Sequence, residues 1–271
     1  SLACPSTPVS VRIIAMSGTI AIVNQKGGVG KTTTAINLGA SLALAEKDIL
    51  IIDTDPQGNS TSGLGIDRDE LGKSLYDAYA GRCVPDEAVM QTSVQHLDIM
   101  PSTMDLLGVE VELVGREGRE AILSQIIAGI SKEYKYILID CPPSLGLLSL
   151  NALVAAGSVI VPVQCEYYAL EGLSLLTRTL QRVRNSFNPS LEIKGILLTM
   201  FDSRNSLAHQ VAQEVRTHFG KQVFETVIPR NVALAEAPSH GKPIILYDVR
   251  SAGAQSYLSL AKEILNENGA R

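Results

Sequence analysis

Short runs of apolar, mostly β-branched residues alternate along this chain with longer segments that carry apolar residues at helical spacing. The short runs predict buried strands, and the longer segments predict helices that cover them. The expected strands occupy residues 19–23, 48–53, 96–100, 136–140, 158–163, 193–200 and 227–228. The expected helices occupy residues 34–46, 70–79, 104–114, 119–130, 147–156, 170–187, 207–219 and 253–265. This alternation favours an α/β fold, with a mostly parallel, twisted sheet and helices on both of its faces.

The segment between the first expected strand and the first expected helix is rich in glycine and reads N-Q-K-G-G-V-G-K-T-T over residues 24–33. Its glycines let the backbone approach an anion closely, while successive N–H groups and the helix N-terminus attract negative charge. In such a turn Lys31 can reach the β- and γ-phosphates of a nucleotide, and the Thr32 hydroxyl can coordinate Mg²⁺. A phosphate-binding loop is therefore predicted at this point.

Carboxylates close two of the expected buried strands. Asp53 ends one of them and leads into a turn-rich segment that contains Asp55, and Asp140 ends another just before two prolines. Because ligands of open parallel sheets bind at the carboxyl edge of the strands, these three acids are expected beside the phosphate-binding loop. Asp140 is placed to hold the shell of a magnesium ion. The alternative is that these acids only stabilise the turns that follow them.

The composition limits the class of protein. The chain has 271 residues, of which 45% are hydrophobic and 19% are charged, and this balance describes a globular protein with a sizeable core. It contains no run of 18 apolar residues, so no transmembrane helix is expected. The four cysteines lack metal-ligand spacing and are expected to be reduced thiols. The net charge of −5 argues against extensive coating of nucleic acid but leaves room for a local basic patch.

The chain shows no internal repeat and no low-complexity linker, which favours a single domain over residues 18–271. Residues 1–17 contain two prolines, several small residues and no amphipathic pattern, and they make a poor secretory signal. They are expected to be a disordered leader or an expression remnant, with Met16 as a candidate natural start.

The glycine-rich loop departs from the simple G-x-x-x-x-G-K-[ST] pattern, because Gln25 stands where that pattern has a glycine and Lys26 follows it. The resulting form, K-G-G-x-G-K-T-T, resembles the deviant Walker A motif of the ParA/MinD class of ATPases. The longer run N-Q-K-G-G-V-G-K-T-T-T-A-I-N-L is similar to the ParA/Soj partition ATPases, and the resemblance extends from about residue 18 to residue 268.

This resemblance implies a P-loop ATPase that uses ATP and Mg²⁺ and forms a homodimer around two ATP molecules. Lys31 and Asp55 are implied in catalysis, Asp55 by orienting the attacking water. Lys26 is implied to reach the partner subunit's nucleotide, although from its residue type it could be only a solvated lysine. Thr32, Asp53 and Asp140 are implied at the metal. The nucleotide-binding residues carried over are Lys26, Gly27, Gly28, Val29, Gly30, Lys31, Thr32, Thr33, Pro229 and Asn231.

Relatives of this kind bind DNA non-specifically as ATP dimers and are stimulated by a ParB/Spo0J-type centromere-binding partner, which implies a cytoplasmic, nucleoid-associated protein. The candidate DNA contacts are Arg204, Arg230, Lys242 and Arg250. Three further arginines, at 178, 182 and 184, fit a solvated helix face better. Ala233 stands where many relatives carry an arginine, so the strength of the DNA contact is an open point.

Three other functions place different demands on the sequence. A membrane-cycling ATPase of the MinD kind needs a basic amphipathic C-terminal helix, whereas residues 257–268 carry two glutamates against one lysine. A relative of the nitrogenase iron protein needs paired cluster cysteines, which the chain lacks. A nucleotide-dependent scaffold would position other cellular cargo and turn over little ATP, and only identification of its partner separates it from a partition ATPase.

Overall fold

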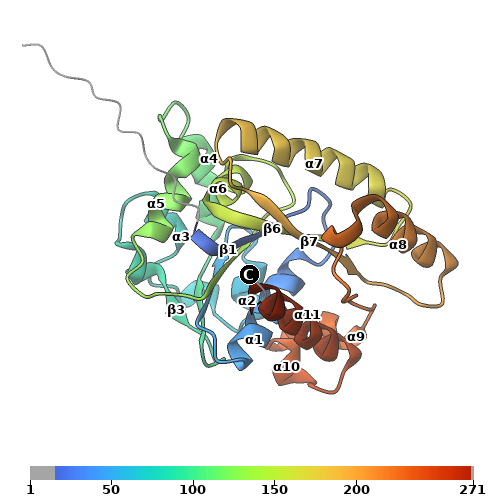
Figure 1. Cartoon of the computed structure of the whole chain (residues 1–271). Helices are drawn as coiled ribbons and strands as arrows, with labels where there is room; N and C mark the ends of the chain where they lie inside the picture. The colour runs from blue at the N-terminus through green and yellow to red at the C-terminus, as the bar shows by residue number, and fades with distance from the viewer. Residues whose placement is uncertain (1–15, 270–271) are drawn as a thin grey trace, which may run out of the picture.

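The computed structural model of the chain describes residues 16–269 and contains one seven-stranded sheet (Figure 1). The strand order is β3-β4-β2-β5-β1-β6-β7. Every pairing is parallel except that of β3 with β4, which confirms the mostly parallel sheet expected from the sequence. The strands are β1 (Met16–Ile22), β2 (Ile49–Asp53), β3 (Met90–Gln91), β4 (Leu97–Met100), β5 (Tyr136–Asp140), β6 (Ala156–Gln164) and β7 (Glu192–Thr199).

Helices cover both faces of this sheet. In Figure 1, α6, α7 and α8 lie on one side of the strands, and α1, α10 and α11 lie on the other. The helices are α1 (Lys31–Leu44), α2 (Asn59–Gly63), α3 (Leu75–Tyr79), α4 (Leu107–Glu112), α5 (Ile122–Ala128), α6 (Leu147–Ala155), α7 (Ala169–Ser186), α8 (Ser206–Phe219), α9 (Val232–Glu236), α10 (Ile244–Tyr247) and α11 (Ala252–Gly269).

The continuous apolar runs of the central strands follow from this layering. In β5, Ile137 and Ile139 pack into the core under α3 to α8, whereas Tyr136 and Leu138 pack into the core under α1, α10 and α11. Successive side chains of a strand point to opposite faces, so a strand buried on both sides needs apolar residues at nearly every position.

Two expected elements differ in the structure. The helix expected at 70–79 begins only at Leu75, because the Asp77 carboxylate accepts a hydrogen bond from the N–H of Ser74 at 3.0 Å and caps the helix there. The strand expected at 227–228 is wrong. The N–H of Ile228 donates to the carbonyl of Leu198, but only an isolated bridge between Phe201 and Pro229 follows, since proline has no N–H to extend the pairing.

The order of the strands fixes the position of the glycine-rich loop. β1 lies between β5 and β6, and the chain leaves β1 toward β2 but later returns to the other side through β6. Ligands of open α/β sheets bind at such a switch point, at the carboxyl ends of the strands. Residues 1–15 of the expected leader lie outside the described residues, and β1 starts at Met16. Within residues 16–269, no helix combines the length and the apolar character that crossing a bilayer requires.

Candidate nucleotide and metal site

The loop between β1 and α1 needs glycine at two positions. Gly28 has φ of 72° and Gly30 has φ of 89°, a left-handed conformation that strains other residues. Gly30 directly precedes α1, so the loop amides and the positive end of a 14-residue helix face the same space. The predicted phosphate-binding geometry therefore rests on the backbone itself.

Side chains and carbonyls from two strands hold this loop in place. Asn24 Nδ2 donates to the carbonyl of Pro162 in β6 at 2.7 Å, and Asn24 Oδ1 accepts from the N–H of Lys26 at 3.0 Å. At the other end, Thr199 Oγ1 in β7 donates to the carbonyl of Val29 at 2.9 Å. The loop is thus preorganised by the sheet.

Lys31 lies inside the loop and is only 7% exposed. Its Nζ donates to the carbonyl of Lys26 at 3.1 Å. Burial lowers the pKa of Lys31, and the nearby charge of Asp140 opposes that shift. A desolvated ammonium group that points into an anion-binding loop is suited to phosphate oxygens.

Asp140 is fully buried at the end of β5. Its Oδ2 accepts a hydrogen bond from Ser60 Oγ at 2.7 Å, whereas its Oδ1 has no hydrogen-bond partner among the described residues. Burial raises the pKa of Asp140 to about 6, and the hydroxyls of Ser60 and Thr32 counteract that shift. A buried carboxylate oxygen without a donor is free to accept a cation.

This arrangement fits Mg²⁺. Among residues 16–269, no group of three or more His, Cys, Asp or Glu side chains could form a closed metal site. Magnesium instead favours one or two carboxylates together with substrate phosphates and water. Asp140 Oδ1 and the Thr32 hydroxyl supply such a partial set next to the phosphate-binding loop.

Asp53 lies beside Asp140, and the two residues are Cα partners in the pairing of β2 with β5. Both Asp53 oxygens already accept hydrogen bonds: Oδ2 from the N–H and Oγ1 of Thr61, and Oδ1 from the N–H of Asp55. Burial raises the pKa of Asp53 to about 7, and the charge of Asp140 adds to that shift. Neither oxygen of Asp53 is without a donor, in contrast to Oδ1 of Asp140, and a role of Asp53 at the metal stays a prediction.

Asp55 is the second residue after β2 and is 8% exposed. Its Oδ1 accepts from the N–H of Gln57 at 3.0 Å, which shapes the turn. The guanidinium of Arg68 donates to the carbonyls of Pro56 and Gln57 at 3.0 and 2.6 Å. Asp55 therefore has a turn-stabilising contact, and a role in orienting water stays a prediction.

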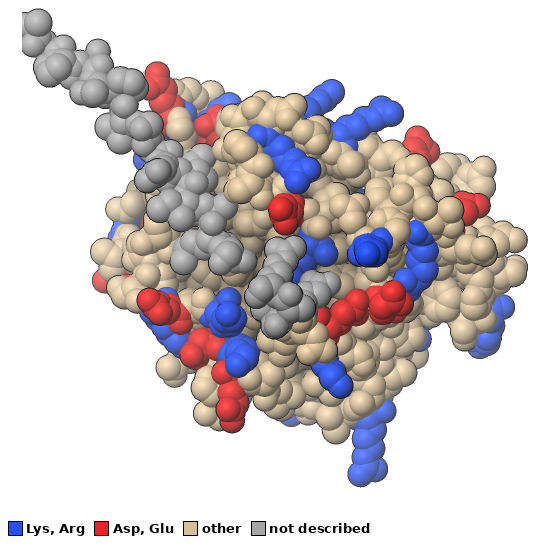
Figure 2. Space-filling model, viewed as in Figure 1, with Lys and Arg blue, Asp and Glu red and all other residues tan. Residues whose placement is uncertain are grey.

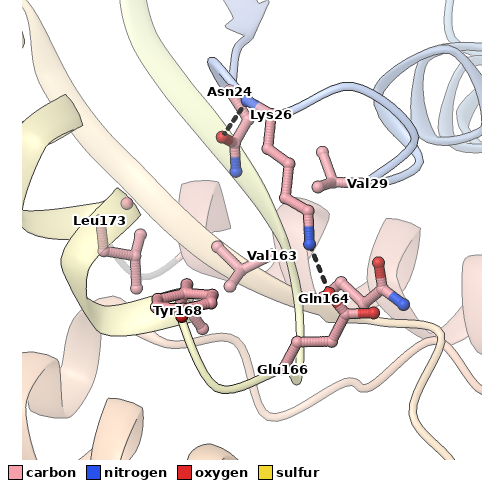
Figure 3. A pocket seen from close by; sticks show the side chains of 10 residues that line it. Asn24, Lys26, Val29, Val163, Gln164, Glu166, Tyr168 and Leu173 are labelled. Atoms are coloured by element: carbon pink, nitrogen blue, oxygen red, sulfur yellow. Dashed lines mark hydrogen bonds and ion pairs between the residues drawn. The ribbon is translucent and has the colours of Figure 1, made fainter.

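Lys26 leaves the loop in a different direction from Lys31. Its side chain is 54% exposed and forms an ion pair with Glu166, which follows β6 (Figure 3). Val163, Tyr168 and other residues line a small cavity of about 40 Å³ beside this pair. Glu166 was not among the expected site residues, although an acid two residues after a strand, at the carboxyl edge of the sheet, was a signal that could have identified it.

Pro229 and Asn231, which the resemblance implies as nucleotide-binding residues, line a cavity together with residues of the loop and of α1. This cavity has a volume of about 200 Å³, and Gly30, Thr33 and Tyr257 also line it. Asn231 Oδ1 also accepts from the N–H of Leu234 at 3.2 Å and so caps α9. The cavity has the position expected for a base, while the contact itself stays a prediction.

The four candidate DNA contacts occupy three segments of the chain: Arg204 precedes α8, Arg230 precedes α9, and Lys242 and Arg250 flank α10. Arg204 is exposed and forms a bidentate pair with Asp202, at 3.0 and 2.9 Å. The hydrogen bonds from Arg204 lower the pKa of Asp202 to about 2, and the charge of Arg230 adds to that shift. Arg230 also lines the cavity next to Pro229. On the face drawn in Figure 2, basic and acidic side chains are interspersed, and DNA binding by these four residues stays a prediction.

Two hydroxyl residues of this site, Ser60 and Thr61, were not among the site residues expected from the sequence. Ser60 and Thr61, at the start of α2, donate to Asp140 and Asp53 respectively. Both follow the turn that begins at Asp55. Their residue type, close in sequence to two buried acids, was the available signal, but their targets depend on which strands pair.

The fold and the loop together define a P-loop α/β nucleoside triphosphatase. A family model described as an AAA domain matches residues 17–193. The chain belongs to this family, and within it to the ParA/Soj chromosome-partitioning ATPases. It is 57% identical to "Chromosome partitioning protein ParA" of Myxococcus xanthus over 249 residues, which cover 92% of this chain and 88% of the relative.

Two further comparisons agree. The chain is 53% identical to "Chromosome-partitioning ATPase Soj" of Treponema pallidum, covering 94% of this chain and all of the relative. Among solved structures, a Mycobacterium smegmatis protein described as cobyrinic acid a,c-diamide synthase, with bound ADP and magnesium, is 36% identical with a TM-score of 0.82. That match covers 94% of this chain and 97% of the solved one.

Proposed function

We propose that this chain is an ATP-hydrolysing DNA-partitioning protein that works as a cycle of nucleotide states. With ATP and Mg²⁺ it forms a sandwich dimer that binds nucleoid DNA non-specifically. Hydrolysis, stimulated by a ParB/Spo0J-type partner, releases it from DNA. The relatives named ParA and Soj support this proposal, and the geometry of the loop supports its chemistry.

The single observation that carries the chemistry is the unpartnered Oδ1 of Asp140 beside the phosphate-binding loop. A buried carboxylate oxygen with no donor costs free energy unless a cation or a hydrogen bond meets it. Asp140 and the Thr32 hydroxyl would hold Mg²⁺ at this point. When bound, the ion neutralises charge that develops on the β- and γ-phosphates.

The other residues of the site would bind the phosphates, orient the attacking water and contact the base. The amides of Gly27, Gly28, Val29 and Gly30, with Lys31 and Thr33, would hold the phosphates of ATP. Phosphoryl transfer needs mainly positioning and charge stabilisation, and Lys31 supplies a desolvated positive charge for it. Asp55 would orient the attacking water from the segment after β2. Pro229 and Asn231 would contact the base from the cavity that they line.

Lys26 would act across the dimer. Its exposed side chain is tied to its own chain only by the ion pair with Glu166, among the contacts of residues 16–269, and surface pairs of this kind contribute about 0–1 kcal/mol. Exchanging Glu166 for the phosphates of the partner's nucleotide therefore costs little. A positive charge delivered in this way would serve as an arginine finger does.

DNA binding would use Arg204, Arg230, Lys242 and Arg250. For a protein of net charge −5, such binding has to come from a local patch rather than from the molecule as a whole. Binding through phosphates falls steeply as salt is raised, because bound cations are released from DNA.

The test is DNA binding by gel shift at two salt concentrations, with ATP, with ADP, and with Asp55→Ala plus ATP. Salt-sensitive binding that needs ATP and persists in Asp55→Ala would support the cycle and place hydrolysis at release. If a protein that dimerises with ATP bound no DNA, the DNA-partition proposal would be wrong and the ATPase would carry another cargo.

A further inference from the structure

We propose that Ser60 is a positioning residue for magnesium, which it serves by fixing the orientation of the Asp140 carboxylate. Ser60 is fully buried, and its Oγ donates to Asp140 Oδ2 at 2.7 Å. The second oxygen, Oδ1, has no hydrogen-bond partner among the described residues. One oxygen is thus anchored while the other is left for the metal. This inference rests on the proposed function.

The other polar neighbours of Asp140 do not provide this anchor. The Thr32 hydroxyl lies close enough to lower the pKa of Asp140, but it does not meet hydrogen-bond geometry to either carboxylate oxygen. Thr54 donates twice, from its N–H at 3.0 Å and from Oγ1 at 2.7 Å, but both bonds go to the main-chain carbonyl of Asp140. Thr61 donates to Asp53 instead. Within residues 16–269, Ser60 Oγ is therefore the one donor that meets hydrogen-bond geometry to this carboxylate.

Loss of the anchor would affect metal binding in particular. A carboxylate held by one hydrogen bond at one oxygen keeps its other oxygen in a fixed direction, and partners of metal ligands commonly contribute 10- to 100-fold in metal affinity. Without the hydroxyl, the Asp140 side chain could rotate, and it would lose a charge-assisted hydrogen bond in a buried place.

The position of Ser60 also links the metal to the rest of the site. Ser60 and Thr61 are neighbours in α2, and they bind the two acids that end β5 and β2. The turn from Asp55 to Gly58 leads directly into this helix, with the N–H of Gly58 donating to the carbonyl of Asp55. Asp55 and the metal ligand Asp140 are thus connected through a short stretch of chain and one hydroxyl.

The experiment compares Ser60→Ala with a matched control, Ser62→Ala. Ser62 lies in the same helix, and its Oγ donates to the carbonyl of Gly58 at 3.1 Å, away from the acids. Ser60→Thr keeps a hydroxyl, and Ser60→Cys keeps nearly the same volume with a weaker donor. Folding of each variant is checked first by thermal unfolding.

Two quantities are then measured for the full chain. The first is the affinity for Mn²⁺, followed by electron paramagnetic resonance in the presence of a non-hydrolysable ATP analogue. The second is the affinity for that analogue in EDTA. We expect Ser60→Ala to weaken Mn²⁺ binding about tenfold, which corresponds to ~1.4 kcal/mol, and to leave the metal-free affinity within about twofold. Ser60→Thr should retain Mn²⁺ binding, and Ser60→Cys should be intermediate.

The outcomes separate this inference from the proposed function. If the unchanged chain bound Mn²⁺ and Ser60→Ala bound it equally well, the positioning role would be wrong while the metal site stood. Equal losses in Ser60→Ala and Ser62→Ala would also overturn it, because the effect would then belong to the helix. If the unchanged chain bound no Mn²⁺ with nucleotide, the proposed function itself would fail. Should Ser60→Ala not fold, Ser60→Cys decides by the same criterion.

Discussion

Asp53 and Asp140 are the last Cα pair of the parallel ladder between β2 and β5, and both are fully buried. Burial is the main reason that the pKa of each is raised, to about 7 for Asp53 and about 6 for Asp140. Two neighbouring acids in a buried place oppose folding when both are charged. A cation bound beside Asp140 would offset the repulsion between these two acids and so stabilise the folded protein.

The first prediction concerns pH in protein free of nucleotide and metal. At pH values between the unfolded pKa of 3.8 and the raised folded pKa values, Asp53 and Asp140 bind protons in the folded protein but not in the unfolded chain. The free energy of unfolding should therefore rise as pH falls from about 7.5 to about 5.5, by about 1–3 kcal/mol. Urea unfolding in EDTA measures it. A decrease in stability over this window would contradict the raised pKa values.

The second prediction is that Asp140→Asn stabilises the metal-free protein at neutral pH by about 1–2 kcal/mol and abolishes ATP turnover. The amide oxygen can still accept from Ser60, while the charge opposite Asp53 is removed. The slope of stability with pH should become shallower for the same reason. Added Mg²⁺ with nucleotide should raise the melting temperature of the unchanged chain but not that of the variant.

The third prediction separates the two lysines of the loop. Lys31→Ala should lose most nucleotide binding, at least about tenfold, because a buried charge that faces the phosphates is removed. Lys26→Ala should keep ATP binding and lose ATP-dependent dimerisation, with turnover reduced about 10³-fold or more if Lys26 acts as a finger. Fluorescent-nucleotide titration and light scattering measure the two effects.

The control for Lys26→Ala is Lys221→Ala, which also removes an exposed lysine but lies after α8. It should leave binding, dimerisation and turnover unchanged. Dimerisation of Lys26→Ala at the level of the unchanged chain would refute the cross-dimer role.

The fourth prediction concerns the salt dependence of DNA binding. Replacing both Lys242 and Arg250 with alanine should weaken binding to DNA of any sequence. The slope of log affinity against log salt should fall by about 1 for each DNA phosphate that the variant no longer binds. Arg182→Ala, on the exposed side of α7, is the matched control and should have no effect. Equal weakening in the control would show that net charge, rather than a patch, determines binding.

The fifth prediction concerns stability. Asn188 is buried, and its Nδ2 donates to the carbonyls of Leu153, Val154 and Ala156, where α6 ends and β6 begins. Asn188→Ala would leave these acceptors unsatisfied and should lower the free energy of unfolding by about 2–3 kcal/mol. Exposed Asn185→Ala should change it by no more than about 0.5 kcal/mol in the same chemical unfolding experiment.

Local patterns in the sequence were sufficient for most of the strands, the glycine-rich loop and the acids that end β2 and β5. Each of these signals is contained within a few adjacent residues. A strand buried on both sides has to be apolar throughout, and a turn with positive φ at Gly28 and Gly30 favours glycine. The resemblance to ParA/Soj proteins rests on the same local signals.

Only the tertiary structure decided which residues meet. The pairing of β2 with β5 places Asp53 opposite Asp140. The next residue, Thr54, donates a hydrogen bond to the carbonyl of Asp140, which lies 86 residues further along the chain. The same pairing brings Ser60 to Asp140, and the position of β6 brings Glu166 to Lys26. Tertiary pairing also decided the segment at 227–228, whose apolar residues predict a strand. In the fold, this segment is followed only by an isolated bridge between Pro229 and Phe201. Such contacts depend on strand order and helix packing over the whole domain, which no short window of sequence specifies.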